Sequence, residues 1–167
     1  MKSFLMFATV CMVSLTACAQ NTKSPVTETS GTSAGGATIY IRYNAPSVRG
    51  RTIGKDLEPM PGKVWRTGAD SATAFEINKD VKIGGKVLKA GRYALFTIAD
   101  GDNWTIIFNN DVHKWGAFSY KESEDVIRVN VTATKAASFA EKFKITVGKA
   151  GKVDLLWGDS DVSFKVD

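Results

Sequence analysis

The sequence predicts an all-β protein, folded as an antiparallel β-sandwich of about nine strands. Beyond residue 37, hydrophobic residues recur at every second position almost throughout, which is typical of strands with one buried face. Runs of glycine and short polar residues separate some of these segments, as in the turns of antiparallel hairpins. The chain has 167 residues, of which 44% are hydrophobic, and this suffices for one domain with a single core.

The clearest alternation occurs in residues 127–131, 142–147 and 162–166. In the second of these segments, Phe143 and Ile145 alternate with polar residues, so one face is apolar and the other is polar. Further strands are expected at residues 38–43, 73–77 and 153–157. A sandwich is the simplest architecture that buries one face of so many strands.

Two hairpins are predicted in the middle of the chain. Residues 81–83 and 86–88 are joined by a Gly-Gly dipeptide, which accepts the positive φ angles of a two-residue turn. Residues 92–98 and 104–109 are separated by a short polar segment that suits a tight loop. Residues 135–142 contain helix-favouring alanines but lack a strong cap, so at most one helical turn is expected there.

The first residues have the shape of a bacterial secretion signal. A short basic start precedes residues 4–17, which carry no charge and are too few for a bilayer-spanning helix of about 20 residues. The motif Leu-Thr-Ala-Cys, ending at Cys18, resembles the lipobox of bacterial lipoproteins. We therefore expect residues 1–17 to be a lipoprotein signal peptide and Cys18 to receive the lipid. The alternative is an ordinary signal peptide with a chance cysteine.

Lipidation would hold the mature protein on the membrane, because two or more acyl chains, such as palmitate, give stable anchoring. Ala19, where an aspartate would favour the inner membrane, favours the periplasmic side of the outer membrane within the cell envelope. With Cys11 removed and Cys18 modified, the mature domain has no thiol. Disulfide bonds, thiol catalysis and cysteine-ligated metal sites are thereby excluded.

Residues 18–37 are expected to form the lipidated cysteine and a flexible tether. After the cysteine, this segment is rich in Ser, Thr and Gly and nearly free of large apolar side chains, so it does not offset the entropy lost on ordering. Its r.m.s. span is roughly 25 Å. The β-sandwich domain is accordingly expected at residues 38–167.

The positive charge is concentrated in one segment. Between residues 42 and 66 there are six Lys and Arg against two acids, within a formal net charge of +5 for the whole chain. This segment lies largely in residues 44–72, where strand patterns are weakest, and long loops in compact domains are commonly functional. A carboxylate, sulfate or phosphate would find a cationic field and Arg side chains here. The alternative is an irregular, solvated connection, and the basic balance alone does not imply nucleic acid.

Tryptophan provides a second indication of a binding site, because an exposed indole can stack on a sugar ring. Trp65 and Trp104 are expected in the core, as buried tryptophan is the commoner case. Trp115 is the expected exception, because it lies in a loop next to a glycine.

Signs of catalysis are few. His113 is the only histidine, so a site with two or three histidine ligands is excluded, and no metal or other cofactor is expected. The sequence has no Gly-x-Ser-x-Gly nucleophile elbow, and its acidic residues occur where turns need polar side chains. No catalytic residue is assigned.

Several motifs in a fixed order resemble a known bacterial family. They are Tyr43-x-x-Pro46-Ser47-x-Arg49-Gly50-Arg51, the run GKVWRTGA at 62–69, AGRYALF at 90–96, residues 104–109, Trp115-Gly116 and Asp125-Val126. Over residues 38–167 they are similar to domain-of-unknown-function family 2911. The resemblance implies an exported or lipid-anchored all-β domain and no particular activity.

These motifs fall mainly in the basic segment and around Trp115, which leads to a hypothesis about the site. We expect one pocket that binds an anionic or sugar-like ligand of the envelope, lined by Arg49, Arg51, Lys63, Trp65, Arg66 and Trp115. The competing hypotheses are a structural or protein-interaction lipoprotein, in which these residues lock the loops together, and a hydrolase that uses His113. The oligomeric state stays open.

Overall fold

The computed structural model describes residues 24–112 and 115–167. The predicted signal peptide at residues 1–17, the lipidation site Cys18 and His113 lie outside the described residues. Within them the chain forms eleven β-strands and two short 3₁₀ turns, so the all-β prediction is confirmed.

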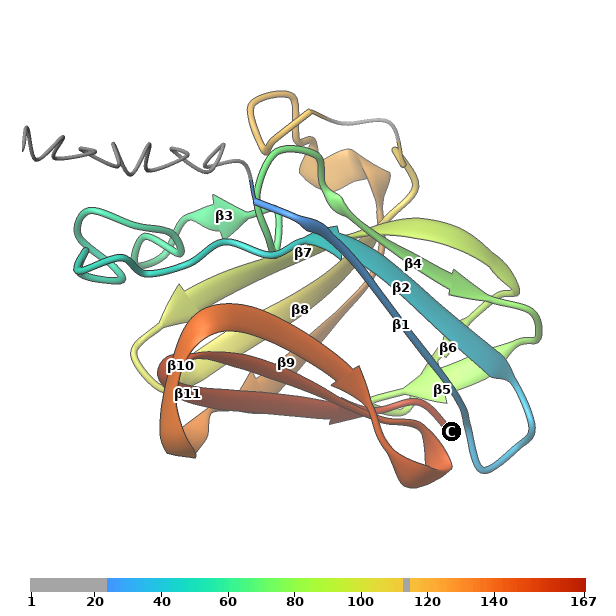
Figure 1. Ribbon diagram of the computed structural model, residues 1–167. Helices are drawn as coiled ribbons and strands as arrows, with labels where there is room; N and C mark the ends of the chain where they lie inside the picture. Colours follow the sequence, from blue (N-terminus) through green and yellow to red (C-terminus); the bar gives the residue numbers. More distant parts are fainter. Residues whose placement is uncertain (1–23, 113–114) are drawn as a thin grey trace, which may run out of the picture.

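The strands are numbered in chain order, as labelled in Figure 1. They are β1 (Val26–Thr32), β2 (Thr38–Asn44), β3 (Val64–Trp65), β4 (Thr73–Ile77), β5 (Val81–Ile83), β6 (Lys86–Leu88), β7 (Gly91–Asp100), β8 (Asn103–Asn109), β9 (Asp125–Thr132), β10 (Thr134–Val147) and β11 (Lys152–Lys165). The 3₁₀ turns are η1 (Glu122–Glu124) and η2 (Lys149–Gly151).

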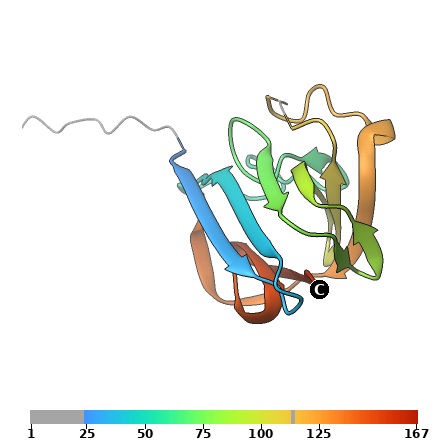
Figure 2. The same ribbon diagram turned by 90° about the vertical axis from the view of Figure 1, so that its right-hand side faces the viewer.

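One antiparallel sheet dominates the fold, with the strand order β1-β2-β4-β7-β8-β9. The short strand β3 pairs with the second half of β7, at Thr97 and Ile98, just beyond Leu95, which pairs with the first residue of β4. The long hairpin β10–β11 packs over the inner face of this sheet and contacts β1 at one edge and β9 at the other (Figures 1 and 2). The two layers enclose a single main core.

Aromatic rings fill the space between the sheet and the hairpin. Phe143 of β10 lies between three other rings, with centroid distances of 5.6 Å to Tyr43, 5.0 Å to Trp65 and 5.8 Å to Trp157, all in edge-on geometry. Such pairs contribute about 0.5–1.5 kcal/mol each beyond their burial. This aromatic cluster lies directly beneath the loop that follows β2.

Both predicted hairpins are confirmed. In the first, β5 and β6 are joined by Gly84 and Gly85 with φ angles of 55° and 78°, as a two-residue turn of the primed type requires. In the second, β7 and β8 pair over seven residues each, from Ala94 opposite Asn109 to Asp100 opposite Asn103.

The tether prediction is wrong for its second half, because residues 26–32 form the edge strand β1. This strand pairs with β2 over its whole length. Its small side chains bury little apolar surface, and the backbone ladder supplies the pairing instead. The domain therefore includes at least Ser24 and Pro25 and does not begin at residue 38.

The helical turn expected at residues 135–142 is also absent, because this segment belongs to β10. It pairs with β11 through two register shifts, and this tertiary pairing overrides the helix preference of its alanines. The strands expected at residues 153–157 and 162–166 are one long strand, β11, which passes through Gly158 at a φ of 59°.

Candidate functional site

The loop between β2 and β3, residues 45–63, is here called the basic loop. It is fixed against the β10–β11 hairpin rather than loosely solvated. The amide of Val48 donates to the carbonyl of Glu141 at 2.8 Å, and the indole N–H of Trp157 donates to the carbonyl of Glu58 at 2.8 Å. The basic loop therefore presents its side chains from a defined backbone path.

Within this loop, residues 48–51 form a tight turn. The amide of Arg51 donates to the carbonyl of Val48 at 3.1 Å, and both central residues have positive φ, 50° at Arg49 and 70° at Gly50. The Arg51 guanidinium also donates to the carbonyls of Val48 at 3.0 Å and Ser47 at 2.6 Å. Arg51 is thus held in place by the turn that it closes, with three of its five N–H donors left over.

A cavity of about 340 Å³ opens beside this turn and is here called the arginine pocket. Its lining residues come from the basic loop, from β3 and the segment after it, and from the start of the described chain. They are Ser24, Pro46, Arg49, Arg51, Leu57, Glu58, Trp65, Arg66, Gly68 and Ala69. Four of the six residues predicted for a ligand site therefore lie around one cavity.

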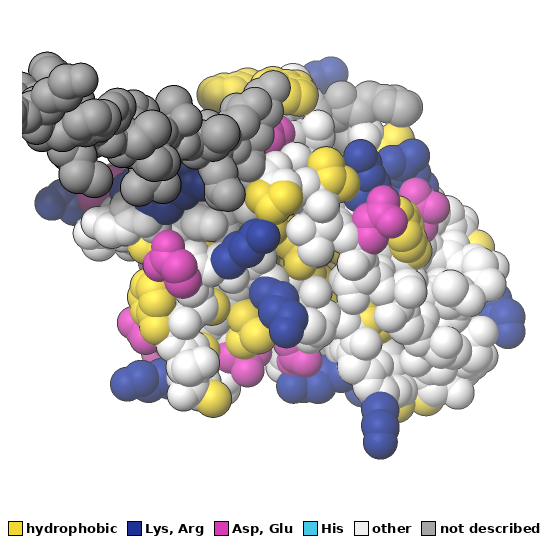
Figure 3. All heavy atoms as spheres, viewed as in Figure 1, with side chains coloured by type: hydrophobic (Ala, Val, Ile, Leu, Met, Phe, Trp, Pro, Cys, Tyr) yellow, Lys and Arg dark blue, Asp and Glu magenta, His cyan; other side chains and the backbone are white. Residues whose placement is uncertain are grey.

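The arginines of this pocket differ from the other three arginines of the chain. The arginines outside the pocket each pair with a carboxylate: Arg42 with Glu28, Arg92 with Glu76 and Arg128 with Asp125. Arg49, Arg51 and Arg66 form no ion pair among the described residues. In addition, Nε of Arg66 is buried without a hydrogen-bond partner there. Figure 3 shows Lys and Arg side chains over this side of the molecule, at the left.

Glu58 is the one acidic residue that lines the pocket in the described chain. Its carboxylate accepts a hydrogen bond of 2.8 Å from the amide of Met60. Three guanidinium groups against one carboxylate leave the pocket with a formal charge of +2. Such a cavity is suited to an anion, because charge-assisted hydrogen bonds from arginine are stronger than neutral ones.

Trp65 contributes to the pocket wall but has no free ring face. Its side chain is 1% exposed, its ring packs edge-on against Phe143, and its indole N–H donates to the carbonyl of Gly68 at 3.0 Å. This burial confirms the expectation that Trp65 lies in the core, and the side chain supports the pocket from within.

Lys63 and Trp115 do not line the arginine pocket. Lys63 is exposed at the end of the basic loop. Trp115 lines a separate cavity of about 210 Å³ together with Arg42, Arg92 and others. It is 69% exposed, whereas the other three tryptophans are at most 5% exposed, which confirms the expectation that Trp115 is the exception.

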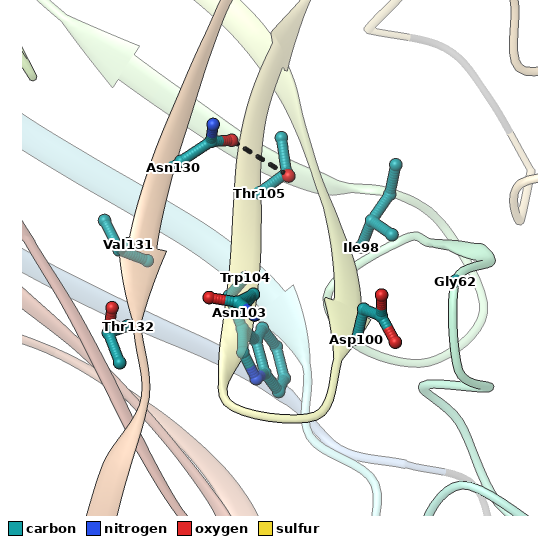
Figure 4. Close-up of a pocket in the computed structure, with 9 residues that line it drawn as sticks. All are labelled: Gly62, Ile98, Asp100, Asn103, Trp104, Thr105, Asn130, Val131 and Thr132. Carbon is teal, nitrogen blue, oxygen red and sulfur yellow. Dashed lines mark hydrogen bonds between the residues drawn. The ribbon is translucent and has the colours of Figure 1, made fainter.

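A larger cavity of about 430 Å³ lies against strands β7, β8 and β9 and is shown in Figure 4. Polar side chains of β7, β8 and β9 line it, and Thr105 donates to Asn130 at 3.1 Å. Asp100 is the one charged lining residue there, and the Trp104 ring is 5% exposed. This cavity offers neither cations nor a free aromatic face.

In the described part of the chain, no group of three or more His, Cys, Asp or Glu residues is arranged to hold a metal ion. No helix there has the length and apolar character needed to cross a membrane. The hydrolase hypothesis depends on His113, which lies outside the described residues.

Ser24 is a pocket residue that sequence reasoning missed. It lies in the segment that was expected to be a tether, and its composition gives no signal of order. Pro46 and Leu57 were likewise missed, because their contribution depends on how the basic loop folds back over the aromatic cluster.

Fold and pocket together define a small all-β sandwich domain with a basic loop held at one end. Residues 24–166 match the family described as Protein of unknown function (DUF2911), and the chain belongs to this family. The matched range begins before β1, in agreement with the corrected domain boundary. No curated protein and no solved structure matches the chain.

Proposed function

We propose that the protein is a lipid-anchored protein of the bacterial cell envelope, and that its β-sandwich binds an anionic ligand in the arginine pocket. The anchor is supported by the uncharged segment at residues 4–17 and by the lipobox-like motif that ends at Cys18. Ala19 favours the periplasmic side of the outer membrane.

One observation carries the binding function. Three of the six arginines of the chain line the same cavity, and they are the three without a carboxylate partner in the described residues. The buried Nε of Arg66 adds an unused donor. An anion in the pocket would supply acceptors to these groups, and burial strengthens such bonds relative to those at an open surface.

The chemistry of the pocket favours charge over ring stacking. Trp65 is buried, so a carbohydrate would bind here through a carboxylate, sulfate or phosphate group rather than through the apolar face of a pyranose. Inorganic phosphate and citrate are therefore suitable first probes.

A structural role is the second candidate, and the hydrogen bonds of Arg51 favour it for that residue. Because the Arg51 side chain closes the turn onto Ser47 and Val48, its removal is expected to destabilise the loop whether or not a ligand binds. Arg66 distinguishes the two candidate functions, because its Nε has no hydrogen-bond partner among the described residues.

Thermal unfolding with and without the probe anions tests the pocket at constant ionic strength. Phosphate or citrate is expected to raise the Tm of the wild type, at roughly 4 °C for each kcal/mol of stabilisation in a domain of this size. Arg66→Ala is expected to fold normally and to lose this rise, whereas the exposed Lys63→Ala is a matched control that keeps it. Equal rises in all three proteins would favour the structural role.

Labelling cells with radioactive palmitate tests the anchor. The wild-type chain is expected to incorporate label and to stay with the membrane fraction. A Cys18→Ala chain that still incorporates label would overturn the assignment of Cys18.

A further inference from the structure

The end of the domain nearest the proposed anchor is defined by Ser24. Its carbonyl accepts a hydrogen bond of 3.2 Å from the side-chain amide of Asn44, and the carbonyl of Pro25 accepts one of 2.9 Å from the amide of Ala45. Five residues lie between Cys18 and Ser24, and these two positions can be at most about 20 Å apart when the chain is fully extended. With a lipid on Cys18, this end of the domain stays close to the membrane surface.

Two loops flank Ser24 at this end. In Figure 1 the start of β1 lies between the basic loop, at the left, and the loop that follows β8, at the top. Residues 115–121 of the latter are here called the aromatic loop. The amide of Gly116 donates to the carbonyl of Asp70 at 3.0 Å, and the Asp70 carboxylate accepts from Asn44 at 3.3 Å. The chain start and the aromatic loop are therefore joined through Asp70.

The aromatic loop carries the two most exposed large hydrophobic side chains of the described residues. Trp115 is 69% exposed and Phe118 is 93% exposed. Figure 3 shows hydrophobic side chains gathered at the top of the molecule, above the rest of the surface. Exposed apolar patches on a protein surface often mark protein-interaction or membrane-binding sites, and tryptophan is enriched at membrane–water interfaces.

This loop is held outward by a partly buried polar network. The Tyr120 hydroxyl donates to the Asp125 carboxylate at 2.5 Å, and Arg128 donates to the same carboxylate at 2.7 Å. The fully buried Asn109 donates to the other Asp125 oxygen at 2.7 Å. Because its base is fixed in this way, the loop presents Trp115 and Phe118 to the surroundings from a rigid support.

The charge on the other side of Ser24 complements an anionic surface. The basic loop and Arg66 carry five cations, Arg49, Arg51, Lys55, Lys63 and Arg66, none of which forms an ion pair in the described residues. The acids of the same segments are Asp56, Glu58 and Asp70, and the Glu141 carboxylate of β10 also lies here, because it accepts from the Arg49 amide at 2.8 Å. The balance is positive, and basic residues close to a lipid anchor are attracted to anionic lipid headgroups.

We infer that this end of the domain docks on an anionic phospholipid surface, with Trp115 and Phe118 in the headgroup layer and a lipid phosphate in the arginine pocket. The inference rests on the proposed function and names the membrane itself as the source of the anion. The lipid on Cys18 keeps the protein at the membrane, and the two loops fix which side of the sandwich faces it. The β5–β6 hairpin, at the opposite end in Figure 1, then points away from the bilayer.

The fluorescence of Trp115 provides the test, because it is the one exposed tryptophan among four. The acylated mature protein is reconstituted into vesicles of phosphatidylethanolamine and phosphatidylglycerol, or of phosphatidylcholine alone. Each lipid set is used with and without bromine atoms on the acyl chains near the headgroups, which quench nearby tryptophans. In brominated anionic vesicles the protein is expected to lose about one quarter of its emission, since one tryptophan in four is within reach.

Two exposed side chains at opposite ends provide the variants. Phe118→Ser removes an aromatic contact and is expected to reduce the quenching at least twofold. Val87→Ser, in the β5–β6 hairpin and 51% exposed, is the matched control and is expected to leave it unchanged. Neutral vesicles, or anionic vesicles at high salt, are expected to give weaker quenching because the attraction of the basic loop is lost or screened.

The possible outcomes separate this inference from the proposed function. Palmitate labelling and phosphate stabilisation without any bromine quenching would overturn the docking and leave the proposed function intact. Equal quenching in neutral and anionic vesicles, or in wild type and Phe118→Ser, would also overturn it. Absence of palmitate label would overturn the proposed anchor and the docking together.

Discussion

The indole N–H of Trp157 in β11 donates to the carbonyl of Glu58 in the basic loop at 2.8 Å, across 99 residues of sequence. Trp157 is 2% exposed, and its ring packs edge-on against Phe143. The bond therefore connects the core of the hairpin layer to the loop that forms the arginine pocket. It shows that the pocket depends on the β10–β11 hairpin as well as on its own segment.

Replacing Trp157 with Phe tests this connection. The smaller ring keeps the site apolar but leaves the Glu58 carbonyl without its donor. We expect a loss of about 1–3 kcal/mol in the free energy of unfolding, measured by urea denaturation. We also expect a smaller rise of Tm with phosphate, because the basic loop is less well fixed. Unchanged stability would show that the bond contributes nothing to the position of the loop.

A substitution in the turn at Arg49 is expected to change the stability of the fold and the binding of anions in opposite directions. Arg49 has a φ of 50°, a conformation that asparagine tolerates better than other residues with side chains. Arg49→Asn is therefore expected to raise the free energy of unfolding by about 0.5–1 kcal/mol while weakening the response to phosphate. Urea denaturation and the anion-dependent Tm measure the two effects.

Arg49→Ala is the control for this experiment. Alanine also lacks the cation, but it gains little relief of the backbone, because its Cβ meets the same clash in the left-handed region. It is expected to weaken phosphate binding as much as asparagine does, without the gain in stability. Equal stability of the two variants would exclude backbone strain at this position.

The sequence predicted most of the sheet because apolar side chains alternate wherever a strand has a buried face. Strand β1 was not predicted, since its inward positions carry threonine and glycine and its pairing comes from the backbone. The strand at residues 135–142 was not predicted either, because its alanine content favours a helix, and pairing with the long strand β11 overrides that preference.

The site was predicted in part. The cluster of cations in a long loop predicted that Arg49, Arg51 and Arg66 belong to one site, and the structure places them around one cavity. The expected burial of Trp65 in the core is confirmed, but sequence alone did not show that Trp115 lines a different cavity. The position of Trp115 depends on the packing of segments that are far apart in the chain.

A substitution at Gly31 tests whether β1 is a folded part of the domain. A Cβ atom at this position would lie 2.5 Å from Cγ1 of Val147 in β10, a contact that forces one of the two strands to move. Gly31→Ala is expected to destabilise the protein by about 1–3 kcal/mol in urea denaturation. Val147→Ala in the same chain removes the clashing methyl group and is expected to recover part of this loss. Strictly additive effects would contradict the contact between β1 and β10.

The support of the aromatic loop predicts a dependence of stability on alkaline pH. Burial, together with the hydrogen bond to the Asp125 carboxylate, raises the pKa of Tyr120 to about 12 from its ordinary value of 10.0. Between these two values the unfolded chain loses the phenolic proton and the folded chain keeps it. The stability that Tyr120 contributes is therefore complete below pH 10 and is lost as the pH rises toward 12.

Tyr120→Phe isolates this contribution. The variant is expected to be less stable than the wild type at pH 8, because Asp125 loses a donor. The difference between the two proteins is expected to shrink as the pH rises from 10 toward 12, since only the wild type carries the titrating group at this position. Urea denaturation at pH 8 and pH 11 measures the difference, and the other tyrosines cancel because both proteins retain them. A difference that stays constant or grows over this interval would contradict the raised pKa and the network that causes it.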